Sequence, residues 1–170
     1  MTKGKFVGVA LGVALAASLG ACNKTETAKP VVDATKTAGT VKADMAQLVA
    51  DFNAHDATKS VSQDAPDYVG MFHGQPNVRG PAGDLALTKQ QVADPAAKVT
   101  VSDETVDVAS AGDMAIYRAT YAYGFTDPKT RKPMTEVGNW IVGYKQQPDG
   151  TMKLAWSVVS DTPAVAPSSK

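Results

Sequence analysis

Four stretches in which apolar and polar residues alternate dominate the second half of this chain. They cover residues 99–110, 114–127, 134–147 and 151–161. Alternation with a period of two is typical of half-buried β-strands, and β-branched and aromatic residues reinforce it here. The connectors at 111–113, 127–133 and 148–150 contain Gly, Pro and Asp, which are turn residues. These stretches therefore predict an antiparallel meander of consecutive hairpins.

A helical pattern precedes the predicted sheet. Residues 41–56 carry apolar side chains at the i, i+3, i+4, i+7 spacing of an amphipathic helix: Met45, Leu48, Val49 and Phe52. Two shorter helices are predicted within 57–65 and over 81–94, and a short apolar strand is predicted at 68–72. Helices followed by hairpins indicate an α+β fold, in which the sheet buries one face against the first helix. A strongly curved sheet can also line a cavity.

The first 22 residues have the composition of a secretory signal. Lys3 and Lys5 precede an apolar run over residues 6–19, which is too short to span a membrane as a helix. The run ends in Leu19-Gly20-Ala21-Cys22, which resembles the bacterial lipoprotein signal. That resemblance implies cleavage before Cys22, acylation of its thiol, and an anchor to the membrane through lipid. The alternatives are an ordinary signal peptide with a coincidental cysteine, or an uncleaved anchor.

The same resemblance predicts where the protein resides. In Gram-negative lipoproteins an Asp after the cysteine commonly directs retention in the inner membrane, and Asn23 stands there instead. We therefore expect a lipid-anchored, periplasm-facing protein of the cell envelope, with the outer membrane favoured over the inner. The expected organisation is a signal peptide (1–21), a flexible tether (22–40), a domain (41–161) and a loose tail (162–170).

Composition argues against several classes of function. Formal net charge is zero, so no basic field favours nucleic acid. One cysteine cannot form an internal disulfide or a cysteine-cluster metal site, and His55 and His73 lack a ligand-type spacing. No Ser/His/Asp spacing, phosphate-binding glycine loop or nucleotide fingerprint is present. The sequence therefore predicts no metal and no cofactor.

Four segments of the chain resemble SnoaL-like domains of the nuclear transport factor 2-like superfamily, which includes steroid delta-isomerase. They are FNAHD (52–56), DYVGMFHGQPNVRGP (67–81), GDMAIYRATYAYGFTDPKTRKPMTEVGNW (112–140) and PDGTMKLAWSVVSD (148–161). The resemblance covers residues 41–161. It implies a cone: a curved, mostly antiparallel sheet wrapped around a long first helix, with a pocket at one end and dimerisation through the sheet in many members.

The superfamily includes isomerases, cyclases, dehydratases and non-catalytic binding proteins, so the fold does not select an activity. Steroid isomerase chemistry needs a carboxylate base and hydroxyl or protonated carboxyl donors. The resemblance places the base near Met71 or Phe72 and the first-helix donor near Leu48, and all three are apolar. This argues against steroid isomerase chemistry.

The candidate pocket residues each have a plainer alternative. His73 follows the 68–72 strand and could act as a base, or could be a solvent-exposed loop histidine. Arg79 could bind an anionic ligand, or hold its loop by bonding carbonyl groups. Tyr117 and Asp161 are candidate partners of His73; Asp161 could instead simply end its strand. His55, at the predicted helix end, is expected to cap or pack.

Alternation leaves open which sheet face lines a cavity. Tyr117, Tyr121 and Tyr123 share one face of their strand, whereas Glu136, Gly138 and Trp140 share one face of the next. Either face of this pair of strands carries aromatic residues. For each of them, plain packing in the core or in an interface is the alternative to ligand contact. The candidate ligand-binding residues are Arg79, Tyr121, Asn139, Trp140 and Trp156.

Three hypotheses follow from the sequence. The first is a non-catalytic, lipid-anchored domain that binds a small, partly apolar molecule or mediates homodimerisation. The second is an isomerase, dehydratase or hydrolase that uses His73 as base with Asp161 or Tyr117. The third is a structural envelope protein whose pocket is filled by side chains. A pocket, and the side chains that line it, would discriminate among them.

Overall fold

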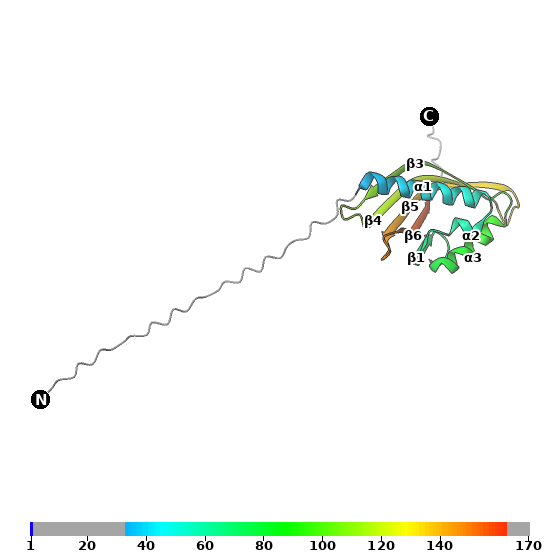
Figure 1. Cartoon of the computed structure of the whole chain (residues 1–170). Helices are drawn as coiled ribbons and strands as arrows, with labels where there is room; N and C mark the ends of the chain where they lie inside the picture. The colour runs from blue at the N-terminus through cyan, green and yellow to red at the C-terminus, as the bar shows by residue number, and fades with distance from the viewer. Residues whose placement is uncertain (2–32, 163–170) are drawn as a thin grey trace. The chain divides into compact units, whose positions relative to one another are not determined.

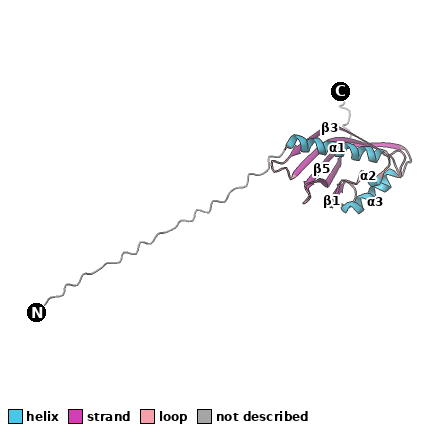
Figure 2. Cartoon of the chain, viewed as in Figure 1, coloured by secondary structure: helices cyan, strands magenta, loops and turns pink. Residues whose placement is uncertain are grey.

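The computed structural model describes Met1 and residues 33–162. The predicted signal peptide, Cys22 and residues 163–170 lie outside the described residues. The described part has an α+β architecture, as the sequence predicted, with three helices and a curved sheet (Figures 1 and 2). Its elements are α1 (Ala34–Asn53), α2 (Ala57–Ser60), β1 (Asp64–Phe72), β2 (Val78–Arg79), α3 (Gly80–Val92), β3 (Lys98–Val108), β4 (Met114–Thr126), β5 (Pro133–Gln146) and β6 (Met152–Asp161).

The first helix begins earlier than the sequence predicted. The Asp33 side chain accepts a hydrogen bond from the Lys36 backbone N–H at 2.9 Å, which caps α1 at Ala34. Val41, in the second turn, is fully buried and holds this part of the helix against the sheet. The expectation of a flexible tether as far as residue 40 is therefore wrong for residues 34–40, because the cap and the buried valine together extend the helix.

His55 ends α1, in agreement with the expectation that it caps or packs. It lies in the left-handed region at φ 60°, and the Asp56 N–H bonds back to the Asp51 carbonyl at 2.9 Å. The His55 N–H bonds to the Phe52 carbonyl at 2.9 Å, which completes a Schellman-type end. The His55 Nδ1 atom also lies 2.7 Å from the Val92 carbonyl oxygen. This side chain thus ties the end of α1 to the end of α3.

The six strands form one sheet in the order β2-β1-β6-β5-β4-β3. The predicted meander accounts for the antiparallel pairs β3–β4, β4–β5 and β5–β6. The sequence did not predict that β1 would join the sheet beside β6, in parallel. This pairing places the strand before α3 next to the last strand, so that α3 closes over the same end of the sheet.

The inner face of the sheet has a filled end and a hollow end. At the filled end, α1 lies against β3 and β4, and the side chains of its early turns join those of early β4 and late β5 in one core cluster. The fully buried side chains there are Val41, Met45, Ala115, Tyr117, Val142 and Tyr144. At the other end, Leu48 and Phe52 of α1 line a cavity together with residues of the late part of β4. One helix therefore supplies both core and cavity wall.

Candidate functional site

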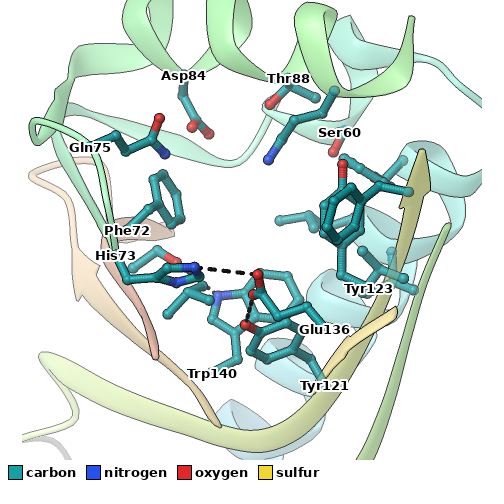
Figure 3. A pocket seen from close by; sticks show the side chains of 18 of the residues that line it. Ser60, Phe72, His73, Gln75, Asp84, Thr88, Tyr121, Tyr123, Glu136 and Trp140 are labelled. Carbon is teal, nitrogen blue, oxygen red and sulfur yellow. Dashed lines mark hydrogen bonds and ion pairs between the residues drawn. The ribbon is translucent and has the colours of Figure 1, made fainter. Parts of the chain in front are cut away.

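A cavity of about 660 Å³ lies between the hollow end of the sheet, α1 and α3. We call it the cone cavity. Its labelled wall residues surround an open centre in Figure 3. It is lined by Leu48, Val49, Phe52, Ser60, Tyr68, Phe72, His73, Gly74, Gln75, Asp84, Thr88, Gln91, Val99, Tyr121, Tyr123, Phe125, Pro128, Glu136, Trp140, Leu154, Ser157 and Val159.

Aromatic rings build one wall of the cone cavity. Tyr123 of β4 meets Phe52 of α1 edge to face, with ring centroids 6.1 Å apart. Tyr123 also stacks on Phe125, with centroids 5.3 Å apart. These contacts lie within the usual range for aromatic pairs. They brace the end of α1 against the strand and present ring surface to an apolar ligand.

A polar group lies on the sheet side of the cone cavity. Tyr121 donates its hydroxyl hydrogen to Glu136 Oε1, and His73 Nε2 lies 3.3 Å from Glu136 Oε2 (Figure 3). Burial, and then the hydrogen bond to and charge of Glu136, raise the pKa of Tyr121. Tyr121 therefore remains a hydrogen-bond donor at neutral pH. The His73 side chain is 44% exposed, which places it at the mouth of the cavity.

A glycine makes room for this group. A Cβ atom at Gly138 would lie 2.7 Å from Cε1 of Tyr121 and 2.0 Å from the Ser160 carbonyl oxygen. Gly138 pairs with Tyr121 in the sheet, between Glu136 and Trp140 on the same face. Its missing side chain lets the Tyr121 ring lie across β5 and reach Glu136.

A second polar group approaches from the opposite side. Asp84 of α3 points into the cone cavity across from Glu136 (Figure 3). Burial raises the pKa of Asp84, and hydrogen bonding with Asp64 and Tyr68 opposes that rise. Burial, followed by the charge of Asp84, raises the pKa of Asp64. Because two adjacent buried carboxyl groups resist double ionisation, they share a proton over a wide pH range.

The polar group around Asp84 extends to the cavity floor. Trp140 donates its Nε1–H to Ser157 Oγ at 2.8 Å. Burial, and the charges of Asp84 and Asp64, raise the pKa of the Tyr68 hydroxyl, so it stays protonated. Asp64 is 9% exposed, and its Oδ2 atom has no hydrogen-bond partner among the described residues. Tyr68 and Ser157 therefore bring hydroxyl groups to the cavity, and Asp64 lies behind its lining next to Asp84.

Three of the predicted site residues line the cone cavity: His73, Tyr121 and Trp140. Tyr117 lies instead in the filled end, fully buried, and donates to Glu104 Oε1 at 2.7 Å. Asp161 is exposed at the end of β6 and does not line the cavity. The partners expected for His73 are thus replaced by Glu136, because Tyr117 lies further down the same face of β4.

The other predicted ligand-binding residues lie elsewhere. Arg79 is exposed at the N-terminal end of α3. Asn139 faces the outer side of the sheet, where it lines a shallow groove with Arg118 and Asp103. Trp156 lies over Gly143, where a Cβ atom would come within 1.9 Å of the indole ring. For Asn139 and Trp156 the next residue along the strand, Trp140 or Ser157, lines the cavity instead.

Sequence reasoning missed Asp84, Asp64 and Glu136. A signal for Asp84 exists, since Asp84, Thr88 and Gln91 follow the i, i+4, i+7 spacing and all line the cavity. For Glu136 the signal is its position: it lies on the same strand face as Trp140, where a charged residue beside an indole suggests a site. Among residues 33–162 with Met1, no group of three or more His, Cys, Asp or Glu side chains could hold a metal ion.

Comparisons with known proteins identify the fold. No protein-family model matches the chain, and no curated protein matches it. A nuclear transport factor 2 (NTF2-like) superfamily protein from Salmonella enterica serovar Typhimurium matches with a TM-score of 0.64 and 10% identity, over 80% of this chain and 98% of that one. A ketosteroid isomerase-like protein from Erwinia carotovora atroseptica matches at 0.62 and 15% identity, over 75% and 98%.

A third solved structure, a candidate dehydratase from the NTF2-like family of Streptomyces avermitilis, has a TM-score of 0.63. It is 17% identical, over 76% of this chain and 99% of that one. At such identities the likeness establishes the fold alone. The NTF2-like cone fold that the sequence predicted is therefore confirmed, and the function has to be argued from the cone cavity.

Proposed function

We propose that this domain binds a small, partly apolar molecule in the cone cavity. The observation that carries the proposal is the cavity itself: about 660 Å³, walled mainly by aromatic and aliphatic side chains, with two polar groups facing across it. Small-molecule sites typically have this volume and this mixture of apolar walls with a few convergent polar groups. A protein whose pocket is filled by side chains, the structural hypothesis, would leave no such space.

The two polar groups define how a ligand would be oriented. Tyr121 and His73 flank Glu136 on the sheet side, and Asp84 with Tyr68 lies on the α3 side. An apolar body between the aromatic walls would bring polar atoms at its ends toward these groups. Burial of the ligand's apolar surface would stabilise the complex. The polar groups of the cavity would replace the hydrogen bonds that the ligand makes to water.

A screen of metabolites by thermal shift on the full chain tests this proposal. A binder should raise the melting temperature as its concentration increases, because it stabilises only the folded state. Val49→Phe adds bulk to the cavity wall and should abolish the shift. Thr58→Phe, at an exposed site of α2 outside the cavity, is the matched control and should preserve it. A shift that survives Val49→Phe would place the ligand elsewhere.

The contact between His73 and Glu136 favours a second candidate function, an isomerase, dehydratase or hydrolase. A neutral imidazole at the cavity mouth can accept a proton, and the carboxylate at 3.3 Å would stabilise the imidazolium that results. Tyr121 holds Glu136 in place. The base in this arrangement is His73. It therefore does not depend on Leu48, Met71 or Phe72, the apolar residues that argue against steroid isomerase chemistry.

Turnover of a ligand found in the screen tests the second candidate. His73→Gln keeps a polar side chain but removes the base, and should lower kcat by at least about a hundredfold with little change in binding. His55→Gln is the control, since His55 contacts a backbone carbonyl at the end of α1. A ligand that binds and is recovered unchanged supports the non-catalytic function.

We further propose that lipid on Cys22 anchors the domain to the cell envelope, facing the periplasm and at the outer membrane. The support is the signal-type segment before Cys22 and the residue after it, Asn23. No helix in the described part of the chain is long and apolar enough to cross a membrane. An anchored binding domain would hold its ligand close to the membrane surface.

A further inference from the structure

We infer that the cone cavity selects ligands that carry an amine, in preference to alcohols or carboxylic acids of the same shape. This inference rests on the proposed binding function and names the chemical class of its ligand. It follows from which charged side chains line the cavity and how each of them is partnered.

The cavity wall is acidic. Two acidic residues, Asp84 and Glu136, line it. Among the residues that the structure describes, no lysine or arginine lines it. His73 is the wall residue that could become a cation, and it already lies against Glu136. A positive group on the ligand would therefore find unmatched negative charge in a largely apolar setting, where such charge attracts more strongly than in water.

Asp84 is the acid that lacks a counter-charge. No ion pair of the described residues involves Asp84 or Asp64. Lys153 is the cation that influences Asp64, yet its Nζ donates to the Ser62 carbonyl oxygen at 3.4 Å and to Gln63 Oε1 at 3.1 Å. Lys153 is thus bonded to the two residues before Asp64, and among the described residues it forms no ion pair with Asp84.

Asp64 reinforces the charge on Asp84. Burial raises the pKa of both acids, so the pair keeps one proton between them and carries one negative charge. A buried acid that stays protonated can support its neighbour as a carboxylate. The Tyr68 hydroxyl adjoins the same carboxylate. Asp84 is the member of this pair that lines the cavity, so it presents the charge of the pair to the open centre (Figure 3).

The remaining wall suits an alkylammonium group as well. Tyr68, Phe72 and Trp140 line the cavity, and aromatic faces attract cations while they also accept apolar chains. A carboxylate ligand would instead meet Asp84 on one side and Glu136 on the other. An alcohol would bond to the same atoms without the charge attraction. The expected order of affinity is amine, then alcohol, then carboxylate.

A matched series of probes tests this order on the full chain: 4-phenylbutylamine, 4-phenylbutanol and 4-phenylbutyrate, measured by isothermal titration or by NMR shift at neutral pH. We expect the amine to bind at least about tenfold more tightly than the alcohol, as one charge-assisted contact would provide. The carboxylate should bind more weakly than both. Asp84→Asn should reduce the ratio of amine to alcohol affinity toward one, because the amide keeps a hydrogen-bonding group and removes the charge.

Asp107→Asn is the matched control. Asp107 lies on β3, exposed, and pairs with Arg118 at 2.5 Å. This variant should bind all three probes as the wild type does. The order measured on the wild type tests the inference even if Asp84→Asn does not fold.

The outcomes distinguish a failure of the amine preference from a failure of the proposed binding function. Equal affinities, or a tighter carboxylate, overturn the amine preference and leave the cavity as a ligand site. An advantage of the amine that persists in Asp84→Asn also overturns the assignment. If none of the probes binds, the inference fails; the proposed function fails with it only if the metabolite screen also yields no ligand sensitive to Val49→Phe.

Discussion

Asp64 and Asp84 illustrate how single residues in this protein work against stability. Asp64 is buried and Asp84 is half-buried, both have raised pKa values, and they lie side by side on β1 and α3. The folded state therefore binds protons that the unfolded chain would release above the ordinary carboxyl pKa of about 4. By linkage, the free energy of unfolding must fall as pH rises from that value through the raised pKa values. Buried charge of this kind is typical of functional sites.

Replacing Asp64 by Asn should flatten this pH dependence. Asn carries no proton to lose, so the melting temperature between about pH 5 and 9 should decline less steeply than in the wild type. The groups that face Asp64 are Asp84, Tyr68 and, from outside, Lys153. The check is a series of thermal melts across this range.

Asp107→Asn serves again as the control, because it changes an exposed acid on the other side of the sheet. Its pH profile should match the wild type. Parallel curves for the wild type and Asp64→Asn would contradict the raised pKa of Asp64 as the source of the effect.

The two halves of α1 have different roles. The early turns of α1 bring Val41 and Met45 into the filled end of the sheet, and its later turns bring Leu48 and Phe52 to the cone cavity. A helix packed along its whole length could line no cavity. The end of α1 is held by the Schellman-type turn at His55 and by the bond from this side chain to Val92. The cavity wall is therefore rigid where Phe52 meets Tyr123.

Removing the cap of α1 should destabilise the domain. Asp33→Ala leaves the first N–H groups of the helix without their acceptor, and should lower the free energy of unfolding by about 1 kcal/mol. Thr35→Ala, in the same turn and exposed, should cause no loss, because alanine is the better helix former. Denaturant unfolding of both variants gives the comparison. Equal stability of the two would mean that helical structure before Val41 contributes nothing.

At the scale of the whole molecule, no helix of the described residues covers the outer face of the sheet. The helices pack on the inner face (Figure 2), and the outer face carries Ile116, Ile141, Val158 and Trp156, each half-buried. Val137 is 45% exposed beside them. We propose that a second copy of this chain covers this face. A self-contact of this kind would be isologous, since the same patch would serve both partners.

A charge at the outer face tests that proposal. Val137→Glu should shift the chain from dimer to monomer, because the carboxylate would have to lose its water in the interface. Lys129→Glu, in the exposed turn between β4 and β5, is the control and should remain dimeric. Light scattering after size exclusion measures the mass. A wild-type chain that is monomeric at micromolar concentration would contradict the proposal.

The anchor is a property of the whole chain as well. Cells that express the protein should incorporate radiolabelled palmitate into it, and Cys22→Ser should abolish the label because no other thiol is present. The variant should also leave the membrane fraction. Label that persists in Cys22→Ser would overturn lipidation at this cysteine. Asn23→Asp, which preserves the thiol, should keep the label and move the protein toward the inner membrane.

The sequence alone determined the elements whose signal is local. Alternation along 99–161 predicted the four-stranded meander, and the spacing of Met45, Leu48 and Phe52 predicted the first helix. Both patterns arise from residues a few positions apart, which is the range over which helix and strand periods act. The turn residues between the strands are local in the same sense. The α+β class followed from their order.

Only the tertiary structure decided how the site is assembled. Alternation could not tell which face of β4 and β5 is concave, because it does not fix the register between strands. The pairing of Tyr121 with Gly138 places the aromatic residues of both strands on the same face. The parallel pairing of β1 with β6 brings residues 64–72 beside residues 152–161, and no local pattern encodes a contact across so much chain. That pairing positions α3, and with α3 it brings Asp84 opposite Glu136. The chemistry of the cone cavity thus depends on long-range packing, which the sequence specifies only through the folded whole.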